Sequence, residues 1–84
     1  MSTFSRDDVI NFLREKVCER TGLAGSDVDE ETILGEAGIR SIDAVLICGQ
    51  IEDHFNLEID PMLMFQYRTI NEVTGRVMEM LESK

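Results

Sequence analysis

The sequence has few of the residues that build catalytic centres or cross-linked frameworks, since its 84 residues include one histidine, one proline, two cysteines and no tryptophan. Cys18 and Cys48 show no metal-ligand spacing, and we expect both to be buried, reduced thiols of a cytoplasmic protein. No apolar run approaches the ~20 residues of a membrane-spanning helix, and the polar start does not resemble a signal peptide. The sequence therefore predicts neither a metal site nor a membrane segment.

Basic residues are also scarce, and the formal net charge is −9. The imbalance lies in residues 23–60, where ten acidic residues accompany a single basic one, Arg40. Phosphate backbones require a basic stripe, so nucleic acid is excluded as a partner. A basic protein surface would be attracted to this segment. A solvated acidic loop that keeps the protein soluble is an equally good interpretation of any one of these acidic residues.

The length fits a single domain over residues 1–84, with no room for a second core or a deep enclosed cleft. Apolar residues at intervals of three and four predict helices at about 6–20, 41–55, 61–66 and 70–82. No stretch alternates between apolar and polar residues as a strand does. The predicted fold class is an all-α bundle of three main helices plus a short third helix.

Capping signals define the ends of these helices. Ser5 and Thr69 each precede an acidic residue by three positions, which is typical of a capping box. Gly22 is suited to end the first helix in a left-handed turn, and Pro61 is suited to the first position of the short helix. Between residues 22 and 40 we expect a long loop held on the core by Ile33, Leu34 and Ile39.

No combination of residues resembles a catalytic or calcium-binding site. Ser41 lacks the second glycine of a nucleophile elbow, and His54 is ~20 Å further along the same predicted helix. Cys48 and His54 face different sides of that helix. The acidic stretch D-V-D-E-E-T lacks the glycine and the final glutamate of an EF-hand loop. We expect no enzyme activity.

The predicted helix 41–55 is apolar on more than one face. Ile47, Ile51 and Phe55 are expected to face the core. A second stripe is left for solvent or a partner, and it consists of Ile42, Val45, Leu46 and Gly49. An exposed apolar stripe of this kind is typical of a docking surface.

Ser41 has two interpretations at the start of this helix. As an N-cap, its hydroxyl would accept a hydrogen bond from an N–H of the first turn, worth ~1 kcal/mol. A helix N-terminus also favours a phosphate ester, because it offers unpaired N–H donors and the positive end of the helix dipole. Taken alone, the cap is the commoner role of such a serine.

The order and spacing of several motifs resemble the carrier-protein family, over about residues 4–82. These motifs are L-G-E-A-G-I-R-S-I-D-A-V, an apolar helix ending I-E-D-H-F-N-L-E-I, and F-Q-Y-R-T-I before an amphipathic last helix. The family includes the acyl and peptidyl carrier proteins of fatty-acid, polyketide and nonribosomal-peptide synthesis. By this resemblance Ser41 matches the serine that a phosphopantetheinyl transferase modifies with coenzyme A. The resulting 4′-phosphopantetheine arm would carry cargo as a thioester.

The sequence departs from the family pattern beside the serine, where Arg40 replaces the usual aspartate. A cation at this position can pair with the phosphodiester of the arm. The start of this helix is the family's docking face, which implies partner contacts by Arg40, Ile42, Val45, Leu46 and Gly49. The few acidic residues on that face favour an aminoacyl or peptidyl carrier. So does F-Q-Y-R-T-I, which resembles the F-x-x-P-T-I of peptidyl carriers with Arg68 in place of the proline.

The expected partners follow from the resemblance. They are the transferase, an adenylation enzyme or ligase, a condensation enzyme or ketosynthase, and a thioesterase, and we expect the protein to meet them as a monomer. One alternative is an acyl carrier protein of fatty-acid or polyketide synthesis. An alternative from another class is a small helical adaptor with no prosthetic group.

Overall fold

The computed structural model describes residues 4–83 and contains three long helices. These are α1 (Arg6–Thr21), α3 (Ser41–Phe55) and α5 (Ile70–Glu82), and they are joined by segments that hold η1 (Gly25–Asp27, a 3-10 helix), α2 (Leu34–Ala37) and α4 (Leu63–Gln66). Within residues 4–83 the only extended pairing is one antiparallel bridge, between Ile33 and Thr69. The predicted all-α fold class is confirmed, with two more short elements than the sequence indicated.

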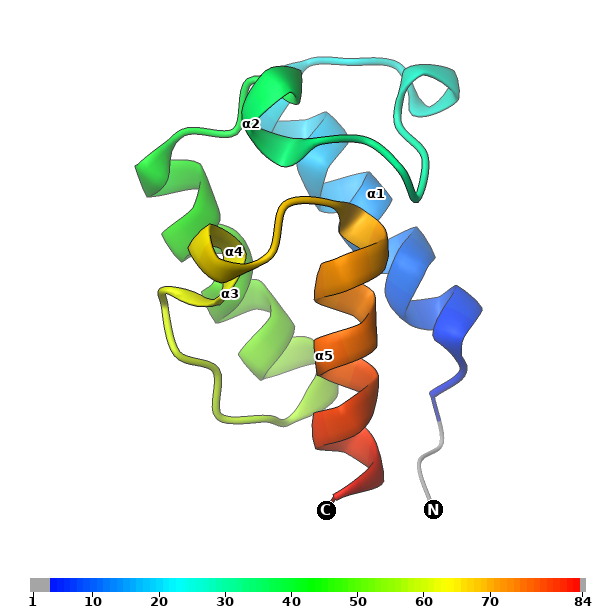
Figure 1. Cartoon of the computed structure of the whole chain (residues 1–84), viewed down its shortest axis with the longest axis vertical. Helices are drawn as coiled ribbons and strands as arrows, with labels where there is room; N and C mark the ends of the chain where they lie inside the picture. Colours follow the sequence, from blue (N-terminus) through cyan, green and yellow to red (C-terminus); the bar gives the residue numbers. More distant parts are fainter. Residues whose placement is uncertain (1–3, 84) are drawn as a thin grey trace.

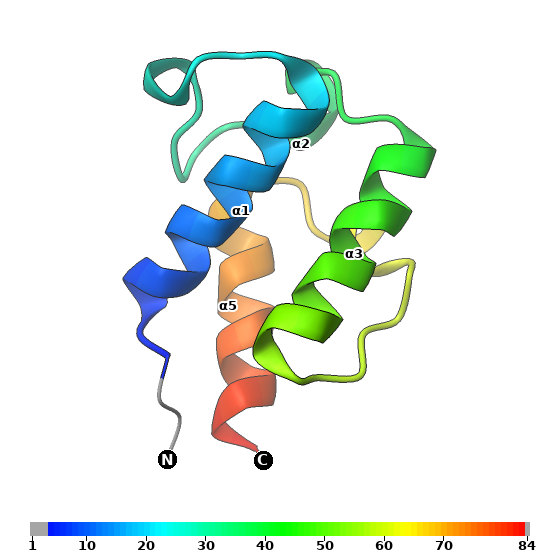
Figure 2. The same ribbon diagram turned by 180° about the vertical axis from the view of Figure 1, so that it is seen from behind.

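The long helices lie side by side, with α1 antiparallel to both α3 and α5 (Figures 1 and 2). Helix α5 packs along α1, and the short α4 packs against α3. The start of α1 and the end of α5 lie at one end of the bundle. The N-terminal end of α3 lies at the opposite end, next to the long connection from α1 (Figure 1).

Most helix ends lie where the capping signals predict. The Ser5 hydroxyl accepts a hydrogen bond from the Asp8 N–H, and the Asp8 carboxylate accepts one from the Ser5 N–H. Thr69 and Glu72 form the same pair at the start of α5. Gly22 ends α1 with φ of 79°, in the left-handed region that glycine adopts without strain.

The predicted start of the short helix at Pro61 is wrong. Pro61 lies in a turn in which the Asp60 carbonyl accepts a hydrogen bond from Leu63 N at 2.9 Å, and the Asp60 carboxylate accepts one from Met62 N at 2.8 Å. Proline is favoured at the second position of such a turn, because its fixed φ suits that position. Helix α4 therefore begins only at Leu63.

One hydrophobic core joins the helices. It consists of Val9, Ile10, Leu13, Val17, Val28, Leu34, Ala44, Ile47, Cys48, Ile51, Phe55, Ile59, Leu63, Met64, Ile70, Val73, Val77 and Leu81. The predicted inward positions Ile47, Ile51 and Phe55 are confirmed. Of the two cysteines, Cys48 is buried as expected, but Cys18 is only partly buried because it lies at the edge of the core.

The connection between α1 and α3 is held to the bundle at several points. Arg14 donates from Nε to the Val28 carbonyl at 2.7 Å, and the Val28 side chain is buried. Leu34 is buried as predicted, whereas Ile33 and Ile39 are only partly buried. These contacts fix the position from which the chain enters α3.

Candidate functional site

The candidate site is the N-terminal end of α3, which has the predicted bounds of about 41–55, although the interpretation of Ser41 as its N-cap is wrong. Arg40 is the N-cap residue, with an extended backbone, and its carbonyl accepts the first helical bond from Ala44 N at 3.0 Å. Arginine has no side-chain acceptor. The Asp43 carboxylate stabilises this end instead, by accepting the Arg40 N–H at 3.0 Å. The helix thus starts one residue earlier than a Ser41 cap requires.

Ser41 is consequently the first residue inside α3, and its side chain is exposed. In the described part of the chain, the Ser41 hydroxyl has no hydrogen-bond partner, and the N–H groups of Ser41 and Ile42 have no acceptor. Unpaired N–H groups and the positive end of the helix dipole favour a negative group at this place. The hydroxyl is therefore accessible, uncommitted and in surroundings that suit a phosphate ester.

Asp43 organises the residues around Ser41. Its side chain is fully buried, and its two oxygens contact Arg20 Nε at 2.8 Å and Arg40 Nε at 3.2 Å. The N–H of Arg40 and the two guanidinium groups hold the pKa of the Asp43 carboxyl well below its usual range. Asp43 is thus a charged group that joins the start of α3 to the last turn of α1, which contains Arg20.

The exposed stripe predicted along α3 is confirmed. The exposed fractions of Ile42, Val45 and Leu46 are 60%, 47% and 45%, and Gly49 is exposed next to them. The sequence analysis missed two further residues, Met62 at 53% and Phe65 at 48%, which come from the turn before α4 and from α4 itself.

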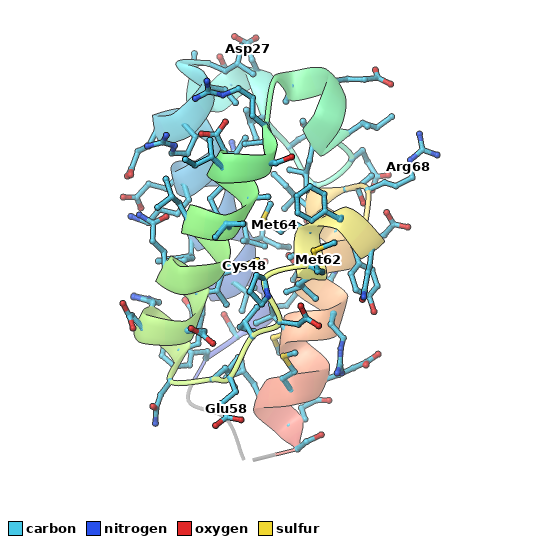
Figure 3. All side chains as sticks on the ribbon, turned by 90° about the vertical axis from the view of Figure 1, so that its left-hand side faces the viewer. Asp27, Cys48, Glu58, Met62, Met64 and Arg68 are labelled. Atoms are coloured by element: carbon cyan, nitrogen blue, oxygen red, sulfur yellow. The ribbon has the colours of Figure 1, made fainter. Side chains whose placement is uncertain are left out.

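Among the described residues, the large exposed hydrophobic side chains all come from α3, from α4 or from the turn that directly precedes α4. We call this set the apolar face, and it consists of Ile42, Val45, Leu46, Met62 and Phe65. Figure 3 views the molecule from the side where α3 and α4 lie next to each other, and Met62 is on that side. The apolar run M-L-M-F could have indicated the exposure of Met62 and Phe65, because a helix of only four residues cannot bury every side chain of such a run.

The other side chains considered for catalysis or metal binding, His54 and Cys48 among them, form no such site with the described residues. The ring of His54 stacks on Phe12 with centroids 4.4 Å apart. Burial raises the pKa of the Cys48 thiol, which disfavours the reactive thiolate. Residues 4–83 hold no group of three or more His, Cys, Asp or Glu placed for a metal ion. No helix in the same range combines the length and apolarity that crossing a membrane requires.

Comparison with known families decides what this site belongs to. A family model described as a phosphopantetheine attachment site matches residues 11–77. The chain belongs to the phosphopantetheine-binding carrier-protein family. Carrier proteins of this family hold 4′-phosphopantetheine covalently, so the cofactor expected from the sequence is confirmed. The family is generally non-catalytic and interacts with synthetases, polyketide synthases and related enzymes.

Solved structures show the same fold. A free-standing peptidyl carrier protein from Acinetobacter baumannii has 24% identity and a TM-score of 0.84, over 95% of this chain and 98% of its own. The HMG-ACPI domain of the CurA module from Lyngbya majuscula has 22% identity and a TM-score of 0.83, over 94% and 80%. An acyl carrier protein from Thermotoga maritima has 29% identity and a TM-score of 0.75, over 93% and 92%. No match to the carrier protein is found among curated protein sequences.

Proposed function

We propose that Ser41 is the residue that carries the 4′-phosphopantetheine arm. The observation that supports this most is the exposed Ser41 hydroxyl, which has no partner among the described residues and lies in the first turn of α3. In the modification, Ser41 Oγ bonds to the phosphorus of coenzyme A next to pantetheine. The bond to the second phosphate breaks, adenosine 3′,5′-bisphosphate leaves, and the hydroxyl proton passes to a base of the transferase.

The residues around Ser41 fit a phosphodiester. The unpaired N–H groups of Ser41 and Ile42 and the Arg40 guanidinium are donors, and Asp43, the nearest acid in sequence, is already paired with two arginines. The arm supplies a terminal thiol that holds cargo as a thioester. The chain itself presents the arm from one end of the bundle, beside the apolar face.

We further propose that the protein is a peptidyl or aminoacyl carrier in nonribosomal-peptide or hybrid natural-product biosynthesis. The apolar face supports this, because such a surface suits hydrophobic docking rather than pairing with a basic partner. Gly49 has open space where a Cβ would lie, which leaves room for a partner side chain, and the exposed Arg40 adds a cation two residues before Ile42. Its expected partners are an adenylation enzyme or ligase, a condensation enzyme or ketosynthase, and a thioesterase. We place the protein in the cytoplasm, since both cysteines are free thiols.

Intact-mass analysis tests the attachment. The protein is incubated with coenzyme A and a broad-specificity phosphopantetheinyl transferase, and Ser41→Ala is treated in parallel. We expect the wild-type chain to gain one phosphopantetheinyl group and the variant to gain none. A wild-type chain that gains nothing, or a gain that persists in Ser41→Ala, would contradict the assignment and favour a simple helical adaptor.

A loading assay tests the class of cargo. The modified protein is offered to adenylation enzymes with a panel of amino acids, and to a malonyl transferase with malonyl-coenzyme A. We expect loading with an amino acid. Loading by the malonyl transferase alone would show that the protein is an acyl carrier of fatty-acid or polyketide synthesis instead.

A further inference from the structure

The charges around Ser41 do not balance. Two guanidinium groups, from Arg20 and Arg40, share the single carboxylate of Asp43. The three groups together carry a net charge of +1, although residues 23–60 hold ten acidic side chains and only one basic one. A buried carboxylate needs one cationic partner to offset its desolvation. The second cation is therefore left with no full counter-charge.

Arg40 is the cation with donors to spare. Its Nε contacts Asp43, while its side chain is 71% exposed. A guanidinium has five N–H donors, and no other acceptor for those of Arg40 is found between residues 4 and 83. Asp43 restrains the inner edge of the guanidinium and leaves its terminal N–H groups in solvent. Arg40 is also the direct neighbour of Ser41 in the chain.

We propose that Arg40 binds the phosphodiester that joins the arm to Ser41, and that Asp43 and Arg20 are the positioning residues that orient Arg40 for this contact. The inference rests on the proposed function of Ser41. A phosphodiester carries one negative charge, which matches the unbalanced positive charge of the cluster. Arginine is well suited to the contact, because its planar fork can donate two parallel hydrogen bonds to phosphate oxygens.

The contact has a consequence for the modified protein. It exists only after modification, so it stabilises the modified form relative to the unmodified one. The Arg40 side chain is largely exposed, so salt screens the contact. We expect modification to raise the Tm by about 2–5 °C at ~0.1 M NaCl and by less than half of that at ~1 M NaCl.

The experiment compares modified and unmodified forms of wild type, Arg40→Gln and Arg68→Gln, each form verified by intact mass. Arg68 is the matched control, because it is exposed, extends away from the bundle in Figure 3, and loses the same charge. We expect wild type and Arg68→Gln to gain Tm on modification, and Arg40→Gln to gain little. The ³¹P resonance of the modified protein should move with salt in wild type and Arg68→Gln but not in Arg40→Gln.

A measurement on the wild-type chain keeps the test independent of how well the variant folds. In ¹⁵N-labelled protein, the Nε–H resonance of Arg40 should shift on modification, while that of Arg68 should not. An unchanged Arg40 resonance, or an Arg40→Gln variant that gains as much Tm as wild type, would overturn the inference while leaving Ser41 modified. Failure of wild type to be modified at all would instead overturn the proposed function.

Discussion

Two isoleucines on α3 provide a direct test of how this helix divides between fold and docking. Ile42 is 60% exposed and belongs to the apolar face, whereas Ile47 is 0% exposed and lies in the core. Substitution by alanine removes the same atoms at both positions. We expect Ile47→Ala to damage stability and Ile42→Ala to damage partner recognition.

The magnitudes follow from these exposures. Truncating a fully buried isoleucine costs about 2–5 kcal/mol, which lowers the Tm of a domain this size by at least about 8 °C. Full burial of an isoleucine side chain is worth about 1.5–3 kcal/mol. A partner that covers Ile42 would bury the exposed part of its side chain, and the part of this surface that alanine lacks is worth about 1 kcal/mol of binding free energy. Loss of that energy in Ile42→Ala would lower kcat/KM about fivefold. Its effect on unfolding should stay within about 0.5 kcal/mol.

The assay has two parts for each variant. Thermal unfolding gives the Tm, and kcat/KM for modification by the transferase gives the effect on recognition. A Tm loss in Ile42→Ala as large as that in Ile47→Ala would refute the division of α3 into two faces. So would an Ile42→Ala variant whose kcat/KM equals that of wild type.

Three other outcomes are expected. Asp43→Asn should lower the Tm at pH 7, and the difference in Tm from wild type should shrink below pH about 4, because a carboxyl whose folded pKa is lowered loses its stabilising effect as pH falls through that pKa. Thermal melts of both proteins at successive pH values measure this difference, and a difference that stays constant would contradict the pairing. Cys18 is partly exposed and should react with iodoacetamide before Cys48, which is 2% exposed and has a raised pKa. Equal alkylation rates of the two cysteines, measured by mass spectrometry, would argue against the burial described. Leu46→Glu should keep the wild-type Tm but slow transfer to a partner enzyme, whereas Asn11→Glu on α1 should slow nothing; equal transfer rates in the two variants would rule out the apolar face as the docking surface.

Helix ends that depend on neighbouring residues were predictable from the sequence. The boxes at Ser5 and Thr69 form within three positions, so a local pattern suffices to find them. The start of α3 uses the same device, since Asp43 accepts the Arg40 N–H from three residues away. It was missed because arginine is not an N-cap residue by preference, and the adjacent Ser41 has the usual cap chemistry.

Features that depend on distant contacts were not predictable. Arg20 and Asp43 are 23 positions apart, and only the packing of α1 against α3 brings them together. Likewise, the position of Pro61 in a turn rather than in a helix depends on two hydrogen bonds to Asp60. The exposure of Phe65 follows from how α4 packs on α3, which apolar spacing alone does not determine.

The apolar face and the acidic connection between α1 and α3 are different parts of the protein surface. Acidic side chains of residues 27–36 lie in the connection between α1 and α3, while the exposed apolar side chains lie on α3 and around α4. A partner that docks on the apolar face would approach the Ser41 end of α3 without having to pair with the five acidic residues between positions 27 and 36. The proposed docking through the apolar face is therefore compatible with the strongly acidic composition of the chain.

Peptide mapping of the modified protein is the most direct test of the central claim. Trypsin cleaves after arginine and lysine, so Ser41 is the first residue of a tryptic peptide that spans residues 41–68. This peptide contains no other serine and no threonine. We predict that the phosphopantetheinyl group is found on this peptide alone and that fragmentation places it on Ser41. Modification of any other peptide, or of none, would contradict the account.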